Sequence, residues 1–316
     1  MDNIGSGTEY DFGEDGIDFD EIPITDKFQF YSEDNKKYVS DAKKDIINLF
    51  GKGILPPECS KTIRILEDGN MYPLDKFHVF YIKQIEVLLE CKYFHWITSY
   101  ALNELIRDGQ LKVQTKKAKY NTIKFLSLPK YRFIMREINR KTKIVDKFSD
   151  SGVTKDLGNH LESIVAQILE SAGFTKFGRS INEYNGRKWN KTNENLDFIF
   201  QKNAISIGIE IKNTLDYINK SEFENKIEMC EYLNIKPFFI VRKMPDNYIL
   251  NLKKHNGGVA IISTQVYPDT KDYRQLTRDI WKELALPVKC HDYLSLKEST
   301  KIPKTLINVA ENLVNR

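Results

Sequence analysis

Asp197, Glu210 and Lys212 lie in two neighbouring apolar segments, in a pattern that could bind a divalent cation and a phosphate. Asp197 belongs to the first segment, and Glu210 and Lys212 belong to the second, with a short polar turn between them. Side chains alternate across a strand, so Glu210 and Lys212 would share one face, about 7 Å apart, while isoleucines take the other. Two carboxylates supply the oxygen ligands that Mg²⁺ prefers, and an ammonium can stabilise charge on a phosphate.

This pattern, Asp197 followed by Glu210-Ile211-Lys212, resembles the signature of the PD-(D/E)XK superfamily, the restriction-endonuclease-like nucleases. The resemblance covers roughly residues 155–267. The residue before Asp197 is Leu196, where the nominal motif has a proline that is often missing across the superfamily. The motif is short and weakly specific as a string, so its weight depends on the elements around it.

The resemblance implies a site, a cofactor and a reaction. Glu162, from the helix that precedes the two strands, would join Asp197 and Glu210 in holding Mg²⁺, with Mn²⁺ as a substitute. Lys212 would stabilise the attacking hydroxide and the charge that builds on phosphorus. The implied activity is that of a Mg²⁺-dependent DNA endonuclease of type II restriction type, which hydrolyses phosphodiester bonds to a 5′-phosphate and a 3′-hydroxyl. Cutting both strands of double-stranded DNA would favour a homodimer.

Other interpretations of the same residues stay open. Lys212 could offset the two carboxylates as a simple salt bridge, because strands with a Glu-x-Lys pattern on one face are common. Within the nuclease class, the alternative is a structure-selective repair nuclease or a Holliday-junction resolvase. Outside it, the alternative is a non-catalytic DNA-binding protein on a nuclease-like scaffold. RNA is an alternative substrate to DNA.

The segments around these residues predict an α/β domain. Their order is helix, strand, strand, helix, strand, strand, which indicates a mixed central sheet flanked by helices, as in the restriction-endonuclease-like core. The expected elements are a helix over 155–171, strands around Asp197 and Glu210, a helix over 219–233, strands over 237–242 and 258–266, and further helices over 273–284 and 305–314.

The region before this domain resembles a winged-helix DNA-binding domain. Apolar spacing predicts helices over 38–50, 77–89 and 96–107, then strands over 111–113 and 122–128 with a basic turn between them. In such a domain the last helix enters the major groove and the hairpin contacts the DNA backbone. The residues expected at base edges are Ser99, Asn103 and Arg107, and those expected at phosphates are Lys116, Lys117 and Lys119. Solvated loop lysines, or a protein-interaction module, are the alternatives.

Three further positions carry charge near the predicted site. Arg187 and Lys188, beside Trp189, suit contact with a nucleic-acid backbone or stacking on a base, although a packed tryptophan with two solvated cations fits as well. Lys226, on the helix after the Glu210 strand, is expected to be a solvated lysine that could assist a phosphate.

Composition divides the chain into three parts and bounds its class. Residues 1–26 contain nine acids and no Lys or Arg, which indicates a flexible acidic tail; residues 27–148 form the winged-helix-like domain with a basic linker helix, and residues 149–316 the nuclease domain. The rest of the chain is therefore more basic than the net charge of +4 indicates, which favours a polyanionic partner. No apolar run approaches the roughly 20 residues that cross a membrane. The four cysteines form no C-x-x-C pair, which fits a cytoplasmic protein.

Overall fold

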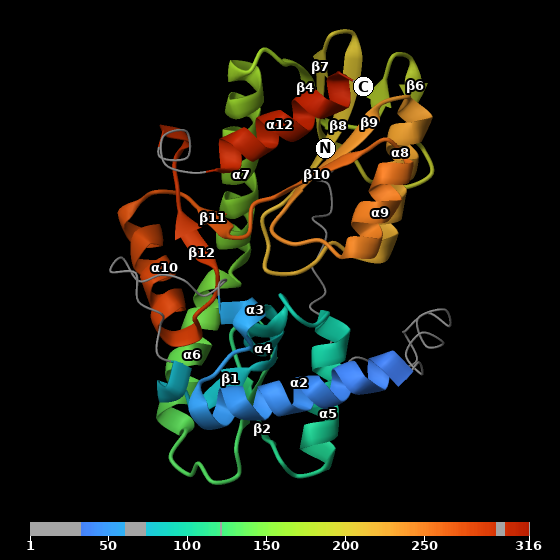
Figure 1. The fold of residues 1–316 in the computed structure, drawn as a ribbon. Coiled ribbons are helices and arrows are strands. Elements are labelled where there is room, and N and C mark those ends of the chain that lie inside the picture. Colours follow the sequence, from blue (N-terminus) through green and yellow to red (C-terminus); the bar gives the residue numbers. More distant parts are fainter. Residues whose placement is uncertain (1–32, 61–73, 121, 295–300, 316) are drawn as a thin grey trace, which may run out of the picture. The chain divides into compact units, whose positions relative to one another are not determined.

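The computed structural model describes residues 33–60, 74–120, 122–294 and 301–315, and it divides into two compact units (Figure 1). Unit 1 contains the described residues up to Lys147 together with Glu283–Leu286, and unit 2 contains Phe148–Lys282 and the described residues from Pro287 onward. The predicted acidic tail, residues 1–26, lies outside the described residues. Each unit is described by itself below.

Unit 2 is built on a five-stranded mixed sheet with the strand order β10-β9-β8-β7-β4. Strand β7 (Leu196–Lys202) pairs antiparallel with β4 (Thr175–Ile181) on one side and with β8 (Ile205–Lys212) on the other. Strands β9 (Lys236–Val241) and β10 (Gly258–Ile261) continue the sheet in parallel from β8. The strand that carries Glu210 is therefore central and is paired on both sides.

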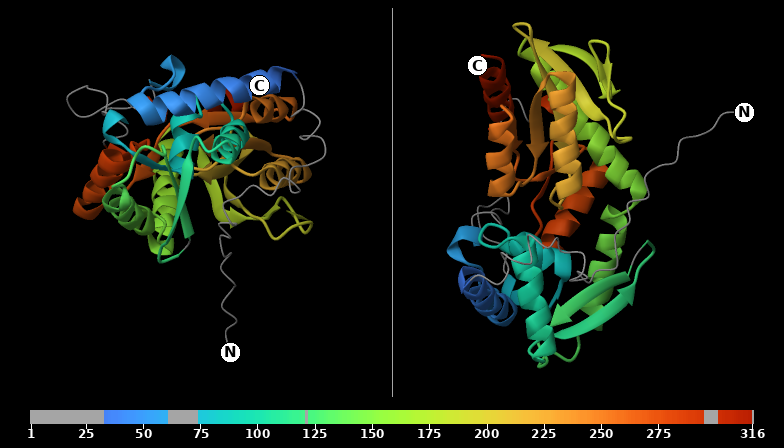
Figure 2. Two further views of the ribbon diagram at one scale, coloured as in Figure 1. Left: turned by 90° about the horizontal axis from the view of Figure 1, so that it is seen from below. Right: turned by 90° about the vertical axis from the view of Figure 1, so that its right-hand side faces the viewer.

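Helices cover both faces of this sheet. On one face, helix α7 (Ser151–Ser171) and helix α12 (Ile302–Val314) pack in one apolar cluster with Ile207, Ile209 and Ile211 of β8. On the other face lie α8 (Lys220–Leu233) and α9 (Asp246–Lys254), which are in front of the strands in the right-hand view of Figure 2. This confirms the predicted α/β architecture of a mixed sheet between helices. It also confirms the isoleucine alternation, which sends Glu210 toward α8.

The remaining elements of unit 2 differ in part from the prediction. Strand β4 and helix α9 were not predicted, and the single strand expected over 258–266 is two strands, β10 and β11 (Gln265–Tyr267), in different sheets. Strand β11 pairs with β12 (Val288–Cys290), and β5 (Glu183–Tyr184) forms a hairpin with β6 (Arg187–Lys188). Helix α10 (Lys271–Leu284) runs from unit 2 into the segment that belongs to unit 1.

Unit 1 combines helices with a three-stranded antiparallel sheet of order β1-β3-β2. Its elements are α2 (Glu33–Lys52), α3 (Pro57–Ser60), η1 (Leu74–Lys76), β1 (Val79–Tyr81), α4 (Ile82–Leu89), α5 (His95–Arg107), β2 (Lys112–Lys117), β3 (Thr122–Ser127) and α6 (Met135–Phe148). Apolar side chains of α2, α4 and α5 share one buried cluster. The β2–β3 hairpin extends beyond these helices (Figure 2).

The helix predicted over 77–89 is wrong in its first part. Val79, Phe80 and Tyr81 form strand β1, which pairs with Phe125–Ser127 of β3, and the helix begins only at Ile82. Branched and aromatic side chains favour an extended backbone, and all three are buried, so their run of apolar letters fits a strand as well as a helix.

A buried ion pair within α6 is hydrogen-bonded to the backbone of β1 in unit 1. The Lys141 ammonium, which is fully buried, lies 2.9 Å from Glu137 and also donates to the Val79 carbonyl. Glu137 in turn accepts the Val79 amide at 3.3 Å. The predicted basic linker helix is thus a packed part of unit 1. Among the described helices of both units, none is long and apolar enough to cross a membrane.

Candidate active site

Asp197 and Glu210 lie across from one another on adjacent strands. The antiparallel register pairs Phe198 with Ile209, and its continuation by one residue sets Asp197 opposite Glu210. Asp197 Oδ2 accepts the amide of Ile211 at 2.6 Å, so its carboxylate reaches the backbone between Glu210 and Lys212. Three of the four predicted catalytic residues therefore meet at the end of the β7–β8 pair.

Glu210 is a carboxylate in the protein core, with 3% of its surface exposed. Lys212 Nζ lies 3.2 Å from its Oε1, and Lys226 Nζ lies 2.6 Å from its Oε2. Although Lys226 is that close, it does not meet the geometry of a hydrogen bond to Oε2, and no other described group donates to this oxygen. Each oxygen of this buried carboxylate therefore faces a lysine ammonium.

Lys212 is held between two carboxylates. Besides Glu210, its ammonium contacts Glu222, in the first turn of α8. Helix α8 begins there because the Asn219 side chain accepts the Glu222 amide at 2.7 Å, which caps the helix. Burial alone would lower the pKa of Lys212, but Glu210 and Glu222 outweigh it and hold the pKa above its ordinary value, so Lys212 is a cation.

The protonation of Asp197 depends on its surroundings. Burial, then the charge of Glu210, raises the pKa of Asp197 to about 8; the Ile211 amide opposes this rise, and Glu162 adds to it. Two neighbouring carboxylates in a partly buried site repel one another. They favour binding of a divalent cation, because the cation removes the repulsion.

Glu162 lies near this pair but is engaged elsewhere. Arg179 of β4 donates from Nε to Glu162 Oε2 at 2.8 Å, and its Nη2 lies 2.8 Å from the same oxygen. Consistent with this, no group of three or more His, Cys, Asp or Glu side chains in the described ranges is placed to hold a metal ion. The expectation that Glu162 is a third metal ligand therefore stays a prediction.

The carboxylates of Asp197 and Glu210 fit Mg²⁺ even without Glu162. This ion keeps several waters and often takes only one or two carboxylates from the protein. Asp197 and Glu210 supply two, and Glu210 Oε2 is a buried oxygen without a hydrogen-bond donor among the described groups.

Lys226 lies beside the candidate site, and the sequence interpretation placed it wrongly. It was expected to be solvated, yet only 5% of its surface is exposed, and its ammonium donates to the Asn195 carbonyl while facing Glu210. The signal was its position on α8: it lies three residues after Phe223 and one before Ile227, inside the apolar stripe that packs on the sheet.

The residues expected to contact DNA bases and phosphates differ in their exposure to solvent. Ser99 is buried and donates its hydroxyl to Glu86 at 2.5 Å, so the expectation that it faces DNA is wrong. Asn103 and Arg107 are exposed on α5, with Arg107 facing Glu104 at 3.8 Å. On the β2–β3 hairpin, Lys117 and Lys119 are exposed and Lys116 is half-buried, and the Lys119 amide donates to Asp146 of α6.

Arg187 and Lys188 are exposed on β6, but they do not border the acidic pair. Arg187 donates to the Tyr232 carbonyl at 3.1 Å, near the C-terminal end of α8. Lys226, which touches the site, lies six residues earlier on this helix, about 9 Å along its axis. Trp189 is buried, which supports its interpretation as a packed side chain.

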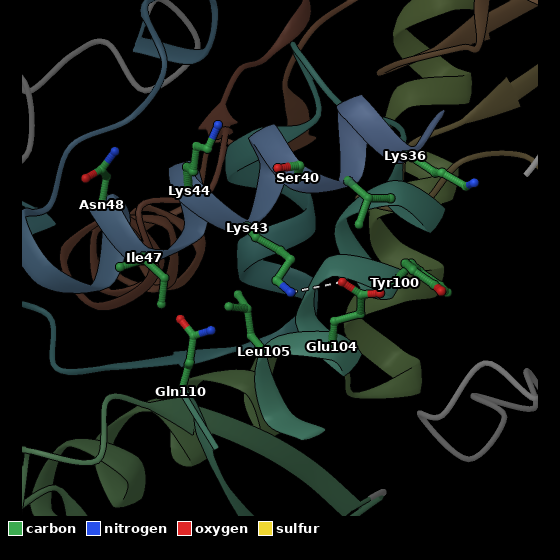
Figure 3. A pocket seen from close by; sticks show the side chains of 11 residues that line it. Lys36, Ser40, Lys43, Lys44, Ile47, Asn48, Tyr100, Glu104, Leu105 and Gln110 are labelled. Atoms are coloured by element: carbon green, nitrogen blue, oxygen red, sulfur yellow. Dashed lines mark hydrogen bonds and ion pairs between the residues drawn. The ribbon is translucent and has the colours of Figure 1, made fainter. Parts of the chain in front are cut away.

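A pocket of about 950 Å³ lies elsewhere, between α2 and α5 within unit 1 (Figure 3). Two of its charged lining residues pair with one another: Lys43 donates to Glu104 at 3.0 Å, and it also donates to Asp108 at 3.1 Å. Because it contains neither a pair of buried acids nor any predicted catalytic residue, it is not the candidate active site.

Comparison with known proteins adds little. No family model matches the chain, and no curated protein matches it. Among solved structures, the chain is similar to a repair endonuclease from Pyrococcus abyssi, with 9% identity and a TM-score of 0.24. The matched region covers 48% of this chain and 62% of that protein. At this TM-score the two proteins are not shown to share a fold.

Proposed function

We propose that the chain is a divalent-metal-dependent nuclease that hydrolyses phosphodiester bonds in DNA, with its active site at Asp197, Glu210 and Lys212. The observation that carries this proposal is the meeting of two carboxylates and a charged lysine at the end of two adjacent strands, with Glu210 Oε2 buried and without a hydrogen bond from the described residues. Two buried acids side by side are costly unless opposite charge compensates them, and a divalent cation between Asp197 and Glu210 would compensate both.

Each residue has a distinct task in this proposal. Asp197 and Glu210 would hold Mg²⁺ or Mn²⁺. When bound, the metal supplies a Lewis acid that polarises the phosphoryl group and acidifies water. Lys212, kept cationic and oriented by Glu210 and Glu222, stabilises the negative charge that develops at phosphorus.

The resemblance to the PD-(D/E)XK superfamily supports this assignment. Helix α7 precedes β7 and β8, β8 is central in a mixed sheet, and the acid pair lies at the strand ends. We extend the proposal to a type II restriction endonuclease that cuts double-stranded DNA as a homodimer. Glu162 would join the metal ligands if Arg179 releases it on metal or DNA binding.

We also propose that unit 1 is a winged-helix DNA-binding domain. Support comes from the order of its elements, which runs helix α2, strand β1, helices α4 and α5, then hairpin β2–β3. Helix α4 supplies the short middle helix of such a fold. Asn103 and Arg107 would reach base edges, and Lys117 and Lys119 would contact phosphates.

One observation favours a second candidate, a non-catalytic DNA-binding protein. Lys212 and Lys226 already balance the charges of Glu210 and Glu222 without any metal. Titration calorimetry with MgCl₂ separates the two candidates, because a site satisfied by its own ion pairs takes up no Mg²⁺.

Digestion of a sequenced plasmid with Mg²⁺ or Mn²⁺ at several salt concentrations, followed by mapping of the ends, tests the proposal. Fixed ends indicate a restriction enzyme, and scattered ends indicate a nuclease that reads DNA shape. Faster cutting of branched or flapped DNA than of linear duplex would favour the repair nuclease or junction resolvase. An intact plasmid under every condition contradicts the nuclease assignment.

A further inference from the structure

Lys226 occupies the side of Glu210 that faces α8. Its ammonium is 2.6 Å from Glu210 Oε2, and its side chain is 6% exposed. It also donates to the carbonyl of Asn195, two residues before Asp197. A buried lysine in this place sets its amino group next to the oxygen that a metal would use.

Glu194 precedes Asn195, whose carbonyl accepts from Lys226, and it pairs with Asn225, the residue before Lys226. Its Oε1 accepts from Asn225 Nδ2 at 3.0 Å, and Asn225 is the α8 residue before Lys226. Its Oε2 is buried, and no described group donates a hydrogen bond to it. Two adjacent contacts, Glu194–Asn225 and Asn195–Lys226, therefore connect residues 194–195 to residues 225–226 of α8.

We propose that Lys226 is an internal counter-ion for Glu210 in the metal-free protein, and that a divalent cation displaces it from Glu210 to Glu194. This inference rests on the proposed function, since it concerns the same site. Lys226 is a positioning residue here: it keeps Glu210 in place for the metal and sets how tightly the metal binds.

Competition between like charges gives the physical reason. An ammonium and a divalent cation repel one another, and both need Glu210, so binding of the metal has to overcome the existing ion pair. An ammonium that leaves one buried carboxylate needs another acceptor, because an unpaired buried charge is strongly unfavourable. Glu194 Oε2 provides that acceptor, and the contact of Lys226 with the Asn195 carbonyl can persist during the move.

Calorimetric titration of the full chain with MgCl₂ alone tests the proposal in four proteins: wild type, Lys226→Met, Glu194→Gln and the double variant. Lys226→Met should bind Mg²⁺ about tenfold more tightly, because the competing charge is gone. Glu194→Gln should bind about three- to tenfold more weakly, because the displaced ammonium loses its carboxylate. In the Lys226→Met background, Glu194→Gln should change the affinity by less than about twofold.

The pair Lys191 and Glu228 supplies matched controls. It is another lysine–glutamate pair that involves α8, at 2.6 Å, but it is exposed. Lys191→Met and Glu228→Gln should leave Mg²⁺ affinity unchanged. If Lys226→Met unfolds without metal, the Mg²⁺ dependence of its thermal unfolding gives the affinity instead.

The outcomes are separable. Equal or weaker Mg²⁺ binding by Lys226→Met, or no recovery of its folding by Mg²⁺, overturns the counter-ion role while the nuclease assignment stands. An equal effect of Glu194→Gln in both backgrounds overturns the role of Glu194. A wild-type protein that binds no divalent cation overturns both this inference and the proposed function.

Discussion

Asp197 Oδ2 accepts a hydrogen bond from the backbone amide of Ile211 at 2.6 Å. This bond crosses from β7 to β8 and ends on the residue between Glu210 and Lys212. It fixes the first acid of the candidate site to the backbone that carries the other two residues. The site is therefore positioned by the central pair of strands, and changes in those strands should alter metal binding and catalysis together.

Lys212→Ala should abolish cleavage while leaving DNA binding. Its ammonium stabilises charge that develops only during the reaction, and the loss of such a contact typically costs about 10²–10³ in rate. Cleavage rates and DNA affinity by fluorescence anisotropy check this. A parallel loss of affinity would mean that Lys212 contributes to ground-state binding instead.

The stability of the metal-free protein should fall as pH rises from about 4 to about 8. The pKa of Asp197 is raised to about 8, mainly by burial and then by Glu210, so the folded state binds a proton that the unfolded chain releases near pH 4. The stability contributed by this group is complete below the unfolded pKa and is lost as pH approaches the folded pKa, with a slope of up to about 1.4 kcal/mol per pH unit. Denaturant titrations in EDTA at several pH values measure it.

Asp197→Asn is the control for this pH dependence, because an amide does not titrate. It should remove this part of the slope, and saturating Mg²⁺ should weaken the slope in the wild type by favouring the ionised carboxylate. An unchanged slope in Asp197→Asn would show that other groups cause it.

Gly208→Ala should lower the free energy of unfolding by about 1–3 kcal/mol through overpacking. A Cβ at this position of β8 would lie 2.8 Å from Ile235 Cδ1 and 2.9 Å from Cys230 Sγ. Gly158→Ala is the matched control, since nothing lies within 4 Å of its Cβ and it is in helix α7, where alanine should stabilise by about 0.5–1 kcal/mol. Urea unfolding of both variants tests this, and equal effects would contradict the close packing of α8 on β8.

The positions of Asp197 and Glu210 were predictable because strand periodicity is a local property. The alternation of four isoleucines with Glu210 and Lys212 was enough to assign their faces. The burial of Lys226 was not predicted because a lysine is normally solvated, and here it depends on pairing with a buried carboxylate of strand β8. Strand β4 was not predicted because it is an edge strand with mostly exposed side chains, so its sequence has no apolar run.

Ser99 was also wrongly expected to be exposed. A serine hydroxyl is polar and usually faces solvent, but here it is buried and paired with Glu86 of α4. Such mutual satisfaction of two polar groups has no signature in the sequence.

Lys141→Met should destabilise the fold of unit 1 by about 3–5 kcal/mol, because it leaves Glu137 as a buried carboxylate without its counter-ion. Adding Glu137→Gln should recover part of the loss. Chemical unfolding of the single and double variants gives both values. Additive losses would mean that the two side chains act independently.

Lys117 and Asn103 should affect DNA binding in different ways. Lys117→Ala should weaken binding to all sequences alike and reduce the salt dependence of log K by about 0.9, the release of one counter-ion. Asn103→Ala should cost about 1–3 kcal/mol only on the preferred sequence. Ser99→Ala, in contrast, should lower stability and leave the affinity of the folded protein unchanged. Anisotropy titrations at several salt concentrations test all three.

The most direct test of the nuclease assignment is the Mg²⁺-dependent cleavage of supercoiled plasmid by the wild type and by Glu210→Gln, at matched protein concentration and with folding verified. The account predicts nicked or linear DNA with the wild type, none in EDTA, and at least about 10²-fold slower cleavage with Glu210→Gln. Cleavage by Glu210→Gln at the wild-type rate, or an intact plasmid with both proteins, would contradict it.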